Sequence, residues 1–420
     1  MHREPIIFVG TSDLSGHFRG KSFPAAQLPS RLERGVGLAP TNLFLSAFGP
    51  IHMTPFGTLG EVFLIPDPGT RVDVPFEGDD GEHFMVGDIV TLEGVPWSHC
   101  PRTVLRRAVE SLHAETGLRL LSTFEQEFTH GGVPAHPARP YELQAYRQQG
   151  RFGTTLLAAL RQAGVQPDSF LAEYGPRQFE VTVAPTVGLR AADEAVITRE
   201  LTQAVAHRFG ATVSFAPLPE LQAASNGTHI HWSFLDEDDR PVLYDPTRPL
   251  GLSPIGSHFI AGVVHHLPLL CAVTAPSVAS YYRLRPDRWA PVRADWGVLD
   301  RGASIRICPP AGRDPAQHAR QFNIEYRVAD ATASPYLALA MLIQAGLDGI
   351  RQHRPLESQG ITALPSSLAE ALELLEASAA AAEWLGPDLT RSYIGFKRGE
   401  INSLEHLEED EICRRYAEVY

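Results

Sequence analysis

The residues of this chain that are best suited to chemistry are carboxylates and histidines that recur at short, matched spacings. They lie in four separated segments, at residues 124–128, 173–180, 226–231 and 325–327. In a β-strand, side chains two residues apart share a face, which puts Glu125 beside Glu127 and His229 beside His231. Oxygen ligands favour Mg²⁺ or Mn²⁺ over a thiolate-rich zinc site. If the four segments converge, the pattern predicts a site for two or three divalent cations.

Each segment alone also has an ordinary structural interpretation. Glu125 and Glu127 fit a solvated strand edge, and residues 173–180 fit a charged loop around a Gly-Pro turn. A lone histidine is usually structural, and Glu325 with Arg327 fits a salt-bridged strand edge. Five carboxylates and a histidine are nevertheless too many for one hydrophobic core to bury without compensating charge. The combination therefore favours a metal site.

Arginines are concentrated in one later region of the chain. They are Arg283, Arg285, Arg288, Arg293, Arg301 and Arg306. Solvation at the surface is the ordinary interpretation, but residues 303–307 are strand-like and place Ser304 and Arg306 on one face. Arginine is suited to bidentate contact with carboxylate or phosphate. Together with the acidic segments, these arginines favour an ATP-dependent enzyme.

The elements that must position these residues are strands and helices in mixed order. The first hundred residues are β-rich, with short strands at 6–9 and 61–65 and a turn at 66–69. A helix begins at Pro101 and stops at Gly117, so we place a domain boundary near residues 96–101. This boundary divides the chain into domains at 1–97 and 98–420.

The second domain continues the mixed pattern. Residues 119–128 are expected to form a strand, and apolar residues at four-residue spacing over 197–209 predict a helix closed by Gly210. A nearly all-apolar helix runs from Pro335 to about residue 347. A capping box at 367–370 opens another helix that is expected to reach residue 386. The mixture predicts the α+β class.

Composition narrows the function classes. The chain has 420 residues and a net charge of −13, which argues against nucleic acid as a partner. No stretch reaches the roughly 18 apolar residues that span a bilayer, so no membrane partner is expected. Four cysteines without C-x-x-C spacing, and no apolar secretory core at the start, predict a reduced cytoplasmic setting.

In their order along the chain, the acidic segments resemble the glutamine synthetase superfamily, from about residue 8 to residue 420. Further matching motifs are GHFRGK at 16–21, IPD at 65–67, SYYRL at 280–284, RGASIR at 301–306, and SPYLALA at 334–340 followed by AGLDGI at 345–350. The resemblance implies an N-terminal β-grasp domain and a catalytic domain with an antiparallel sheet and helices. It also implies a ring-shaped homo-oligomer, a dodecamer, with active sites between subunits.

The resemblance implies a role for each site residue. The matches to the ligands of one metal are Glu127, Glu173 and Glu180, and those of the second are Glu125, His229 and Glu325. The matches near the nucleotide are His231 and Ser233, and the phosphate-handling matches are Arg301 and Arg306. The arginines that match those facing the amino acid and the transferred phosphoryl group are Arg283 and Arg327.

The reaction implied by the resemblance needs these parts. A carboxylate is a poor electrophile, so ATP converts it to an acyl phosphate and an amine then displaces phosphate. Divalent metals and arginines neutralise the charge on the migrating phosphoryl group. The activated acid must be kept from water, which requires a closed pocket. The implied cofactors are therefore ATP and Mg²⁺ or Mn²⁺, and the implied substrates are a small amino acid and an amine.

One departure from the family pattern concerns the amine. Trp289 stands where the family carries a glutamate, just before Ala-Pro, that helps to bind and deprotonate ammonium. An indole N–H only donates hydrogen bonds, whereas its ring can stack on an organic amine. We therefore count Trp289 among the catalytic residues and predict an amine larger than ammonia.

Other departures concern the acid and the nucleotide. Ala224 and Ser225 replace the asparagine and glycine that hold glutamate in the family, and Asn226 could compensate through a shifted loop. Asn323 replaces an arginine near the nucleotide, and residues 35–40 occupy the place of the ammonium-site aspartate of the N-terminal domain. No segment matches the regulatory tyrosine loop of some bacterial glutamine synthetases.

The predicted function is an ATP-dependent ligase that joins glutamate and an organic amine into a γ-glutamyl amide. It resembles the γ-glutamylpolyamine and γ-glutamylalkylamide synthetases. The alternatives are a ligase of the same fold that uses a different carboxylic acid, an authentic glutamine synthetase, and a non-catalytic structural relative.

Overall fold

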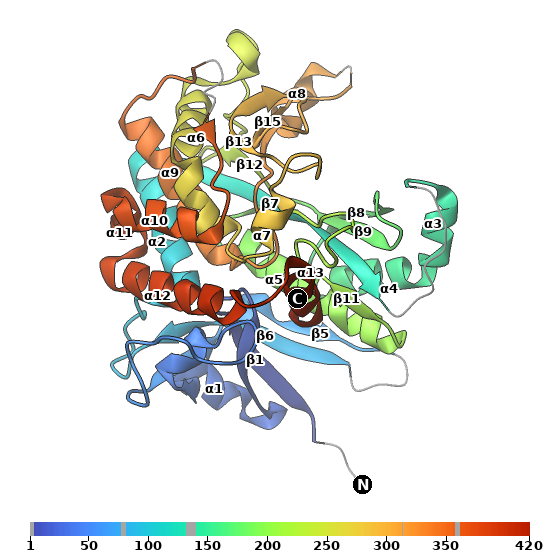
Figure 1. Ribbon diagram of the computed structural model, residues 1–420, viewed down its shortest axis with the longest axis vertical. Helices are drawn as coiled ribbons and strands as arrows, with labels where there is room; N and C mark the ends of the chain where they lie inside the picture. The colour runs from blue at the N-terminus through green and yellow to red at the C-terminus, as the bar shows by residue number, and fades with distance from the viewer. Residues whose placement is uncertain (1–3, 77–80, 132–139, 313, 358–361) are drawn as a thin grey trace.

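The computed structural model describes residues 4–76, 81–131, 140–312, 314–357 and 362–420. A smaller N-terminal domain, blue in Figure 1, lies at one end of the molecule, and a larger domain built on a second sheet lies above it. The C-terminal helices α12 (Pro387–Leu404) and α13 (Glu409–Val419) run back to the N-terminal domain. The arrangement is an α+β fold, as the sequence predicted.

The N-terminal domain is a six-stranded sheet with one longer helix, α1 (Leu28–Arg34). Its path is β2-β1-β6-β4-β3, and β5 pairs with β6. Its strands are β1 (Ile6–Ser12), β2 (Phe18–Pro24), β3 (Val36–Leu38), β4 (Val62–Pro66), β5 (Val72–Val74) and β6 (Glu82–Val90). β1 and β6 are parallel, and the other neighbours are antiparallel. Val9, Leu64 and Val86 fill the core of this domain.

The second domain contains a nine-stranded sheet with the path β14-β15-β16-β12-β7-β9-β8. Two short strands, β10 (Thr186–Val187) and β11 (Thr212–Ser214), also pair with β7. The strands on the path are β7 (Arg119–Gly131), β8 (Pro167–Ala172), β9 (Gln178–Val183), β12 (Thr228–Leu235), β14 (Trp296–Val298), β15 (Ile305–Cys308) and β16 (Asn323–Tyr326). Only β14 and β15 pair in parallel, so the sheet is essentially the antiparallel one that was predicted.

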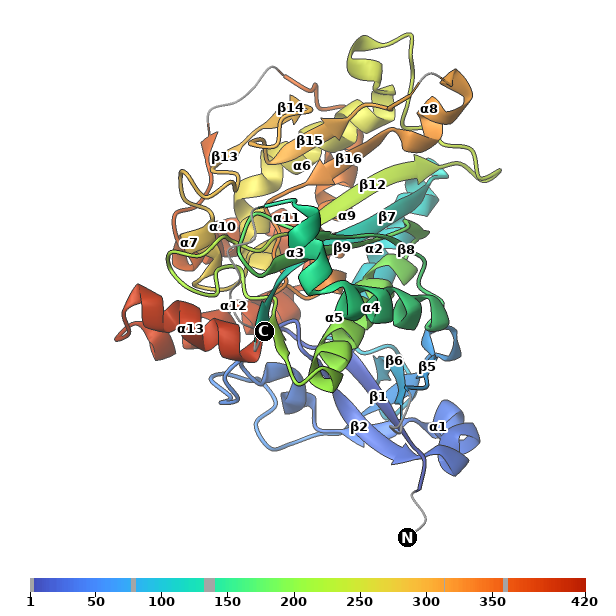
Figure 2. The same cartoon turned by 90° about the vertical axis from the view of Figure 1, so that its right-hand side faces the viewer.

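Alternation along β7 and β12 gives this sheet a buried face and an open face. Phe124 and Ile230 point into the core, while Glu125 and His231 lie on the other face, where they are partly exposed. The buried face packs on long helices that Figure 2 shows behind the sheet. These helices are α2 (Pro101–Thr116), α5 (Arg190–Arg208), α6 (Pro254–Thr274) and α9 (Pro335–Arg351). The acidic residues are therefore held on a rigid, well-packed support.

Helices α6 and α9 cross very closely. A Cβ on Gly262 would lie 2.2 Å from the carbonyl oxygen of Ala345, so only glycine fits at this crossing. By length and composition, one helix among the described residues, α6, could cross a membrane, which corrects the expectation that no such stretch exists. However, 61% of its most apolar window is buried inside the protein, as in a core helix.

The remaining helices lie around the periphery, together with the small β13 (Arg293–Ala294) and β17 (Thr362–Ala363) ladder. They are α3 (Leu143–Gln148), α4 (Gly150–Gln162), α7 (Ser280–Arg283), α8 (Pro315–Gln321), α10 (Leu368–Ala377) and α11 (Ala379–Leu385). The single helix expected over 367–386 was wrong. Ser378 interrupts it, because its hydroxyl accepts a hydrogen bond from the amide of Ala381 and caps a second helix.

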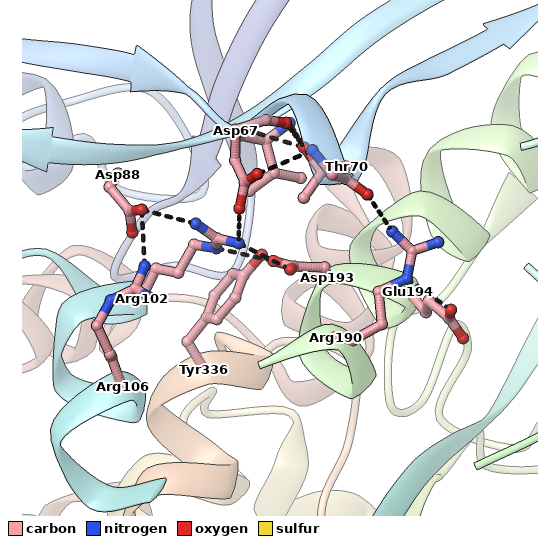
Figure 3. A network of polar contacts seen from close by, with 11 residues as sticks. Asp67, Thr70, Asp88, Arg102, Arg106, Arg190, Asp193, Glu194 and Tyr336 are labelled. Carbon is pink, nitrogen blue, oxygen red and sulfur yellow. Dashed lines mark hydrogen bonds and ion pairs between the residues drawn. The ribbon is translucent and has the colours of Figure 1, made fainter. Parts of the chain in front are cut away.

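The two domains are joined by a charged network around Arg102 of α2, shown in Figure 3. Its guanidinium donates to Asp67 (2.6 Å) and Asp88 (2.8 Å) of the N-terminal domain and to Asp193 of α5 (2.9 Å). Tyr336 of α9 donates to the same Asp193 at 2.7 Å. We call these five residues the Arg102 network. It ties α2, α5 and α9 to the N-terminal sheet.

Candidate active site

The register of five strands, β7, β9, β12, β15 and β16, brings most of the predicted site residues into direct opposition on the open face. Each strand contributes one or two of them, and the opposed pairs are Glu125 with His229, Glu127 with Glu180, His231 with Glu325, and Arg306 with Glu325. Opposed residues in antiparallel strands have Cβ atoms about 4.5–5.5 Å apart. Segments that are up to 200 residues apart in the chain therefore form one continuous polar surface.

Two groups of ligand atoms come close enough to share a cation. Glu125, Glu180 and His229 offer atoms that lie within 4.8 Å of one another, and so do Glu125, His231 and Glu325. His229 Nδ1 lies 2.8 Å from Glu125 Oε1 and 3.5 Å from Glu325 Oε1. Glu125 thus stands between the two groups. His231, which the resemblance places by the nucleotide, lies among the ligand atoms as well.

Glu127 and Glu173 complete the acidic face and are held by neutral donors. The main-chain amide of Gly227 donates to Glu127 at 2.7 Å, and Gln178 lies 3.4 Å from the same oxygen. The hydroxyl of Tyr141 donates to Glu173 at 2.9 Å. Sequence reasoning missed Tyr141, because no local sequence pattern marks it. None of these donors supplies positive charge.

The charges on this face are out of balance. Burial and the negative charges of Glu125, Glu127 and Glu173 raise the pKa of Glu180 to about 10. Burial and the charge of Glu127 also raise the pKa of Glu173. Although burial opposes it, hydrogen bonds from the two histidines hold the pKa of Glu125 well below its usual range. Buried carboxylates that raise one another's pKa, together with imidazole nitrogens, form a donor set that fits divalent cations.

Three of the predicted arginines lie against the acidic face. Arg306 Nε is 2.7 Å from Glu325, and Arg327 donates to the other oxygen of the same carboxylate. Arg283 is 2% exposed and donates to the main-chain carbonyls of residues 327 and 328 at 2.9 and 2.8 Å. A Cβ on Gly227 would lie 2.8 Å from Arg283 Nη2, so a glycine is needed for this close approach.

The fourth predicted arginine, Arg301, is exposed in the turn between β14 and β15. Burial and Glu173 raise the pKa of the Tyr141 hydroxyl to about 12, and the charge of Arg301 acts against this rise.

A cavity of about 340 Å³ opens beside the acidic face. Its wall includes Glu125, His231, Ser233 and Asn323. His231 Nδ1 lies 2.9 Å from Asn323 Oδ1 and its Nε2 lies 3.5 Å from Glu125 Oε2, while the buried Ser233 Oγ has no hydrogen-bond partner among the described residues. A buried polar atom without a partner in a wall of this kind suits a polar ligand. Its size fits part of a nucleotide.

The departures from the family pattern that concern the acid and the amine are connected through the loop that carries Trp289. Trp289 is 81% exposed, and its ring lies 6.1 Å from that of Tyr174. Ser225 donates to the carbonyl of Arg288 at 3.1 Å. The idea that Asn226 compensates for Ala224 and Ser225 is wrong. Its side chain is buried and hydrogen-bonded to Gln178 (3.0 Å) and to the carbonyl of residue 216 (2.9 Å).

A small β-rich domain joined to an antiparallel sheet with an acidic open face defines a class of small-molecule ligases. Family models agree: the glutamine synthetase N-terminal domain matches residues 2–97, and the glutamine synthetase catalytic domain matches residues 98–416. The chain belongs to the glutamine synthetase family and is a ligase of that family. Members of this family use ATP and divalent metals in general.

Individual relatives span nearly the whole chain. The gamma-glutamylpolyamine synthetase GlnA3 of Streptomyces coelicolor is 34% identical, with 99% of this chain and 93% of that protein covered. The glutamine synthetase of Pyrococcus furiosus is 31% identical, with 96% and 91% covered. A crystal structure titled novel glutamine synthase homolog has a TM-score of 0.94 and 40% identity, covering 100% and 99%. These relatives include both a polyamine synthetase and a glutamine synthetase.

Proposed function

We propose that this protein joins glutamate to an organic amine and forms a γ-glutamyl amide at the expense of ATP. The observation that carries the proposal is Trp289, an exposed indole at the position of the family's ammonium-binding glutamate. An indole cannot accept a proton from ammonium, but it presents a flat surface to a carbon-bearing amine. The similarity to a gamma-glutamylpolyamine synthetase supports the same choice.

The proposed reaction consumes ATP and proceeds through an acyl phosphate. The side-chain carboxylate of glutamate takes the terminal phosphoryl group, ADP leaves, and the amine nitrogen then displaces phosphate with loss of one proton. We assign Glu127, Glu173 and Glu180 to one divalent cation, which would lower the negative charge around the transferred group. The residues assigned to the second cation are Glu125, His229 and Glu325, and His231 lies close enough to join them.

The remaining assigned residues act on phosphate and nucleotide. Arg306 and Arg327 converge on Glu325, which fixes their guanidinium groups before any ligand binds. We propose that these groups and Arg301 neutralise phosphate oxygens, since arginine suits this task. The buried Oγ of Ser233 would then find a partner on the nucleotide. Arg283 is assigned to hold the floor of the acid site, because its donors are turned to the main chain.

The decisive experiment measures phosphate release from ATP and Mg²⁺ with glutamate held constant. The amine is varied across ammonium, methylamine, n-butylamine, ethanolamine, an arylamine and 1,4-diaminobutane. We expect phosphate release, and the corresponding γ-glutamyl amide by mass spectrometry, with one or more organic amines. Ammonium should be a poor substrate. Turnover with ammonium alone would establish glutamine synthesis and refute the proposal.

A second candidate keeps the fold but changes the acid. Ala224 carries only a methyl group, Ser225 donates to the carbonyl of Arg288, and Asn226 is turned inward. At the positions that hold glutamate in the family, these residues thus present no free side-chain group that would bind the α-amino or α-carboxylate group of an amino acid. The same assay with the amine fixed and the acid varied separates the two candidates, because the preferred acid gives the highest kcat/KM.

The quaternary structure and compartment follow from family resemblance. We propose a ring-shaped homo-oligomer in the cytoplasm, a dodecamer, in which neighbouring N-terminal domains complete the sites. Sedimentation velocity measures the mass of the particle directly. A monomer that retains full activity would contradict a site shared between subunits.

A further inference from the structure

Two exposed aromatic rings from different loops meet at the mouth of the acidic face. Tyr174 follows Glu173 in the turn between β8 and β9, and Trp289 lies in the loop between α7 and β13. Their ring centroids are 6.1 Å apart and their planes differ by 25°. The two residues are 60% and 81% exposed. Two large rings left this open are not explained by packing within the chain.

The loop that carries Trp289 is held in an unfavourable conformation. Asp287 and Trp289 have φ of 66° and 57°, in the left-handed region that non-glycine residues rarely adopt. Arg288, between them, donates to the carbonyl of Leu221 at 2.6 Å, and Ser225 donates to the carbonyl of Arg288 at 3.1 Å. These bonds fix the loop to the segment before β12. Backbone strain of this kind is found at ligand clamps.

The same bonds connect two departures from the family pattern that looked independent in the sequence. Ser225 supports the main chain of the Trp289 loop, and a Cβ on Gly175, beside Tyr174, would lie 3.0 Å from the Cβ of Ala224. Replacing the family's asparagine and glycine here is therefore part of building the aromatic pair. The segment before β12 serves as the common base of both loops.

We propose that Tyr174 and Trp289 form an aromatic clamp that binds the non-reacting end of a diamine or polyamine. This inference rests on the proposed function. The reacting nitrogen must approach the acidic face as a free amine, whereas a second ammonium group further along the chain stays charged. Aromatic faces attract such a cation and pack against methylene groups. Glu173, adjacent to Tyr174, adds negative potential on the same side.

The test compares amine affinity in matched variants of the full-length enzyme. Tyr174→Leu and Trp289→Leu should each raise KM for 1,4-diaminobutane about tenfold, and KM for n-butylamine less. KM for ATP and for glutamate should stay at the wild-type value. Tyr174→Phe, which keeps the ring, should retain the wild-type KM for the amine. Tyr146→Leu on α3 is the control for the loss of an unrelated tyrosine. An unchanged amine KM in both leucine variants overturns the clamp.

A binding measurement separates failure of the clamp from failure of the proposed function. Tryptophan fluorescence is followed during titration with 1,4-diaminobutane in the presence of Mg²⁺ and ADP. The part of the fluorescence that is lost in Trp289→Phe comes from Trp289. In wild type this part should change saturably with 1,4-diaminobutane, and in Tyr174→Leu the change should need a higher amine concentration. If no amine supports phosphate release, the proposed function fails, and this titration still decides the clamp. A change in particle mass in Tyr174→Leu without a change in binding would assign the pair to subunit contact and overturn the inference.

Discussion

The Arg102 network and the acidic face are both polar regions held between secondary-structure elements, yet their charges are balanced very differently. In the network, the positive charges of Arg102 and the neighbouring Arg106 compensate the negative charges of three aspartates. Burial alone would raise the pKa of Asp67, but hydrogen bonds from Arg102 and the Gly69 amide, together with the charges of Arg102 and Arg106, lower it. On the acidic face, burial and neighbouring carboxylates raise the pKa of Glu180 to about 10. The charges of the Arg102 network are compensated within the chain, whereas the acidic face requires positive charge from a ligand.

The difference separates a structural role from a functional one. Charges that are paired inside the chain hold its parts together, and removing one partner leaves the others buried and unpaired. Charges that repel one another lower stability until a cation binds, so the fold keeps them only where binding is useful. The following variants test whether the two regions differ in this way.

The largest effect is expected from removing one carboxylate of the acidic face. Glu127→Gln keeps an oxygen that can accept from the Gly227 amide but removes a negative charge from the proposed metal site. We expect turnover to fall by about a thousandfold or more, since metal-based charge stabilisation contributes several kcal/mol. Phosphate release measures it. Asp239→Asn, at an exposed surface ion pair, is the control and should stay near wild type. Wild-type turnover in Glu127→Gln would favour a non-catalytic relative.

The next largest effect is expected from opening the Arg102 network. Arg102→Met leaves Asp67, Asp88 and Asp193 without their shared partner, and we expect a loss of about 3–5 kcal/mol in the free energy of unfolding. Chemical denaturation followed by circular dichroism measures it. Arg106→Met is the matched control, because Arg106 is partly exposed and forms an ion pair with Asp88 alone among the described residues; its loss should stay below about 1 kcal/mol. Equal losses in the two variants would contradict the distinction.

Divalent metal should stabilise the acidic face and leave the network unaffected. At a Mg²⁺ or Mn²⁺ concentration about one hundred times Kd, binding to the folded state adds about 2.7 kcal/mol. Thermal unfolding with and without metal measures the shift. Glu180→Gln should be more stable than wild type without metal, because glutamine stays neutral beside the neighbouring carboxylates without having to bind a proton. It should gain less when metal is added, because it lacks a carboxylate ligand. A Glu180→Gln protein that is less stable without metal would show that the repulsion is not significant.

The pH dependence of the metal-free protein should have a defined sign. Glu180 has a raised pKa in the folded state, so its proton is held more tightly there than in the unfolded chain. Its contribution to stability is complete below the ordinary glutamate pKa and is lost as pH rises toward about 10. Unfolding at several pH values, compared with Glu180→Gln, isolates this contribution. Parallel pH profiles for the two proteins would contradict it.

The smallest effect is expected at the aromatic pair of Tyr174 and Trp289. Trp289→Glu adds a carboxylate at the position where the family binds ammonium, and it removes one ring of the aromatic pair. We expect kcat/KM for ammonium to rise relative to organic amines by about tenfold, equal to about 1.4 kcal/mol. Competition between ammonium and 1,4-diaminobutane measures the ratio directly. If kcat/KM for ammonium does not rise, the role assigned to Trp289 in amine selection is contradicted.

Features that depend on local pattern were predictable from the sequence. Spacing of two placed Glu125 with Glu127, and His229 with His231, on the same strand faces, since strand periodicity needs no tertiary information. Pro101 and Gly117 marked the limits of α2 in the same way. Family motifs supplied the matched roles of the site residues, which the structure brings together but does not test.

Only the tertiary structure decided which residues oppose one another and which charges remain unpaired. Strand register places Glu125 opposite His229, and long-range packing sets such a register. The same packing surrounds Arg102 with three aspartates and turns Asn226 inward. The position of Tyr174 directly after Glu173 could have marked it as a site residue, whereas its contact with Trp289 is visible only in the tertiary structure. Sequence thus determined the types of groups available for chemistry, and the folded chain determined their partners, because partners come from segments far apart in the chain.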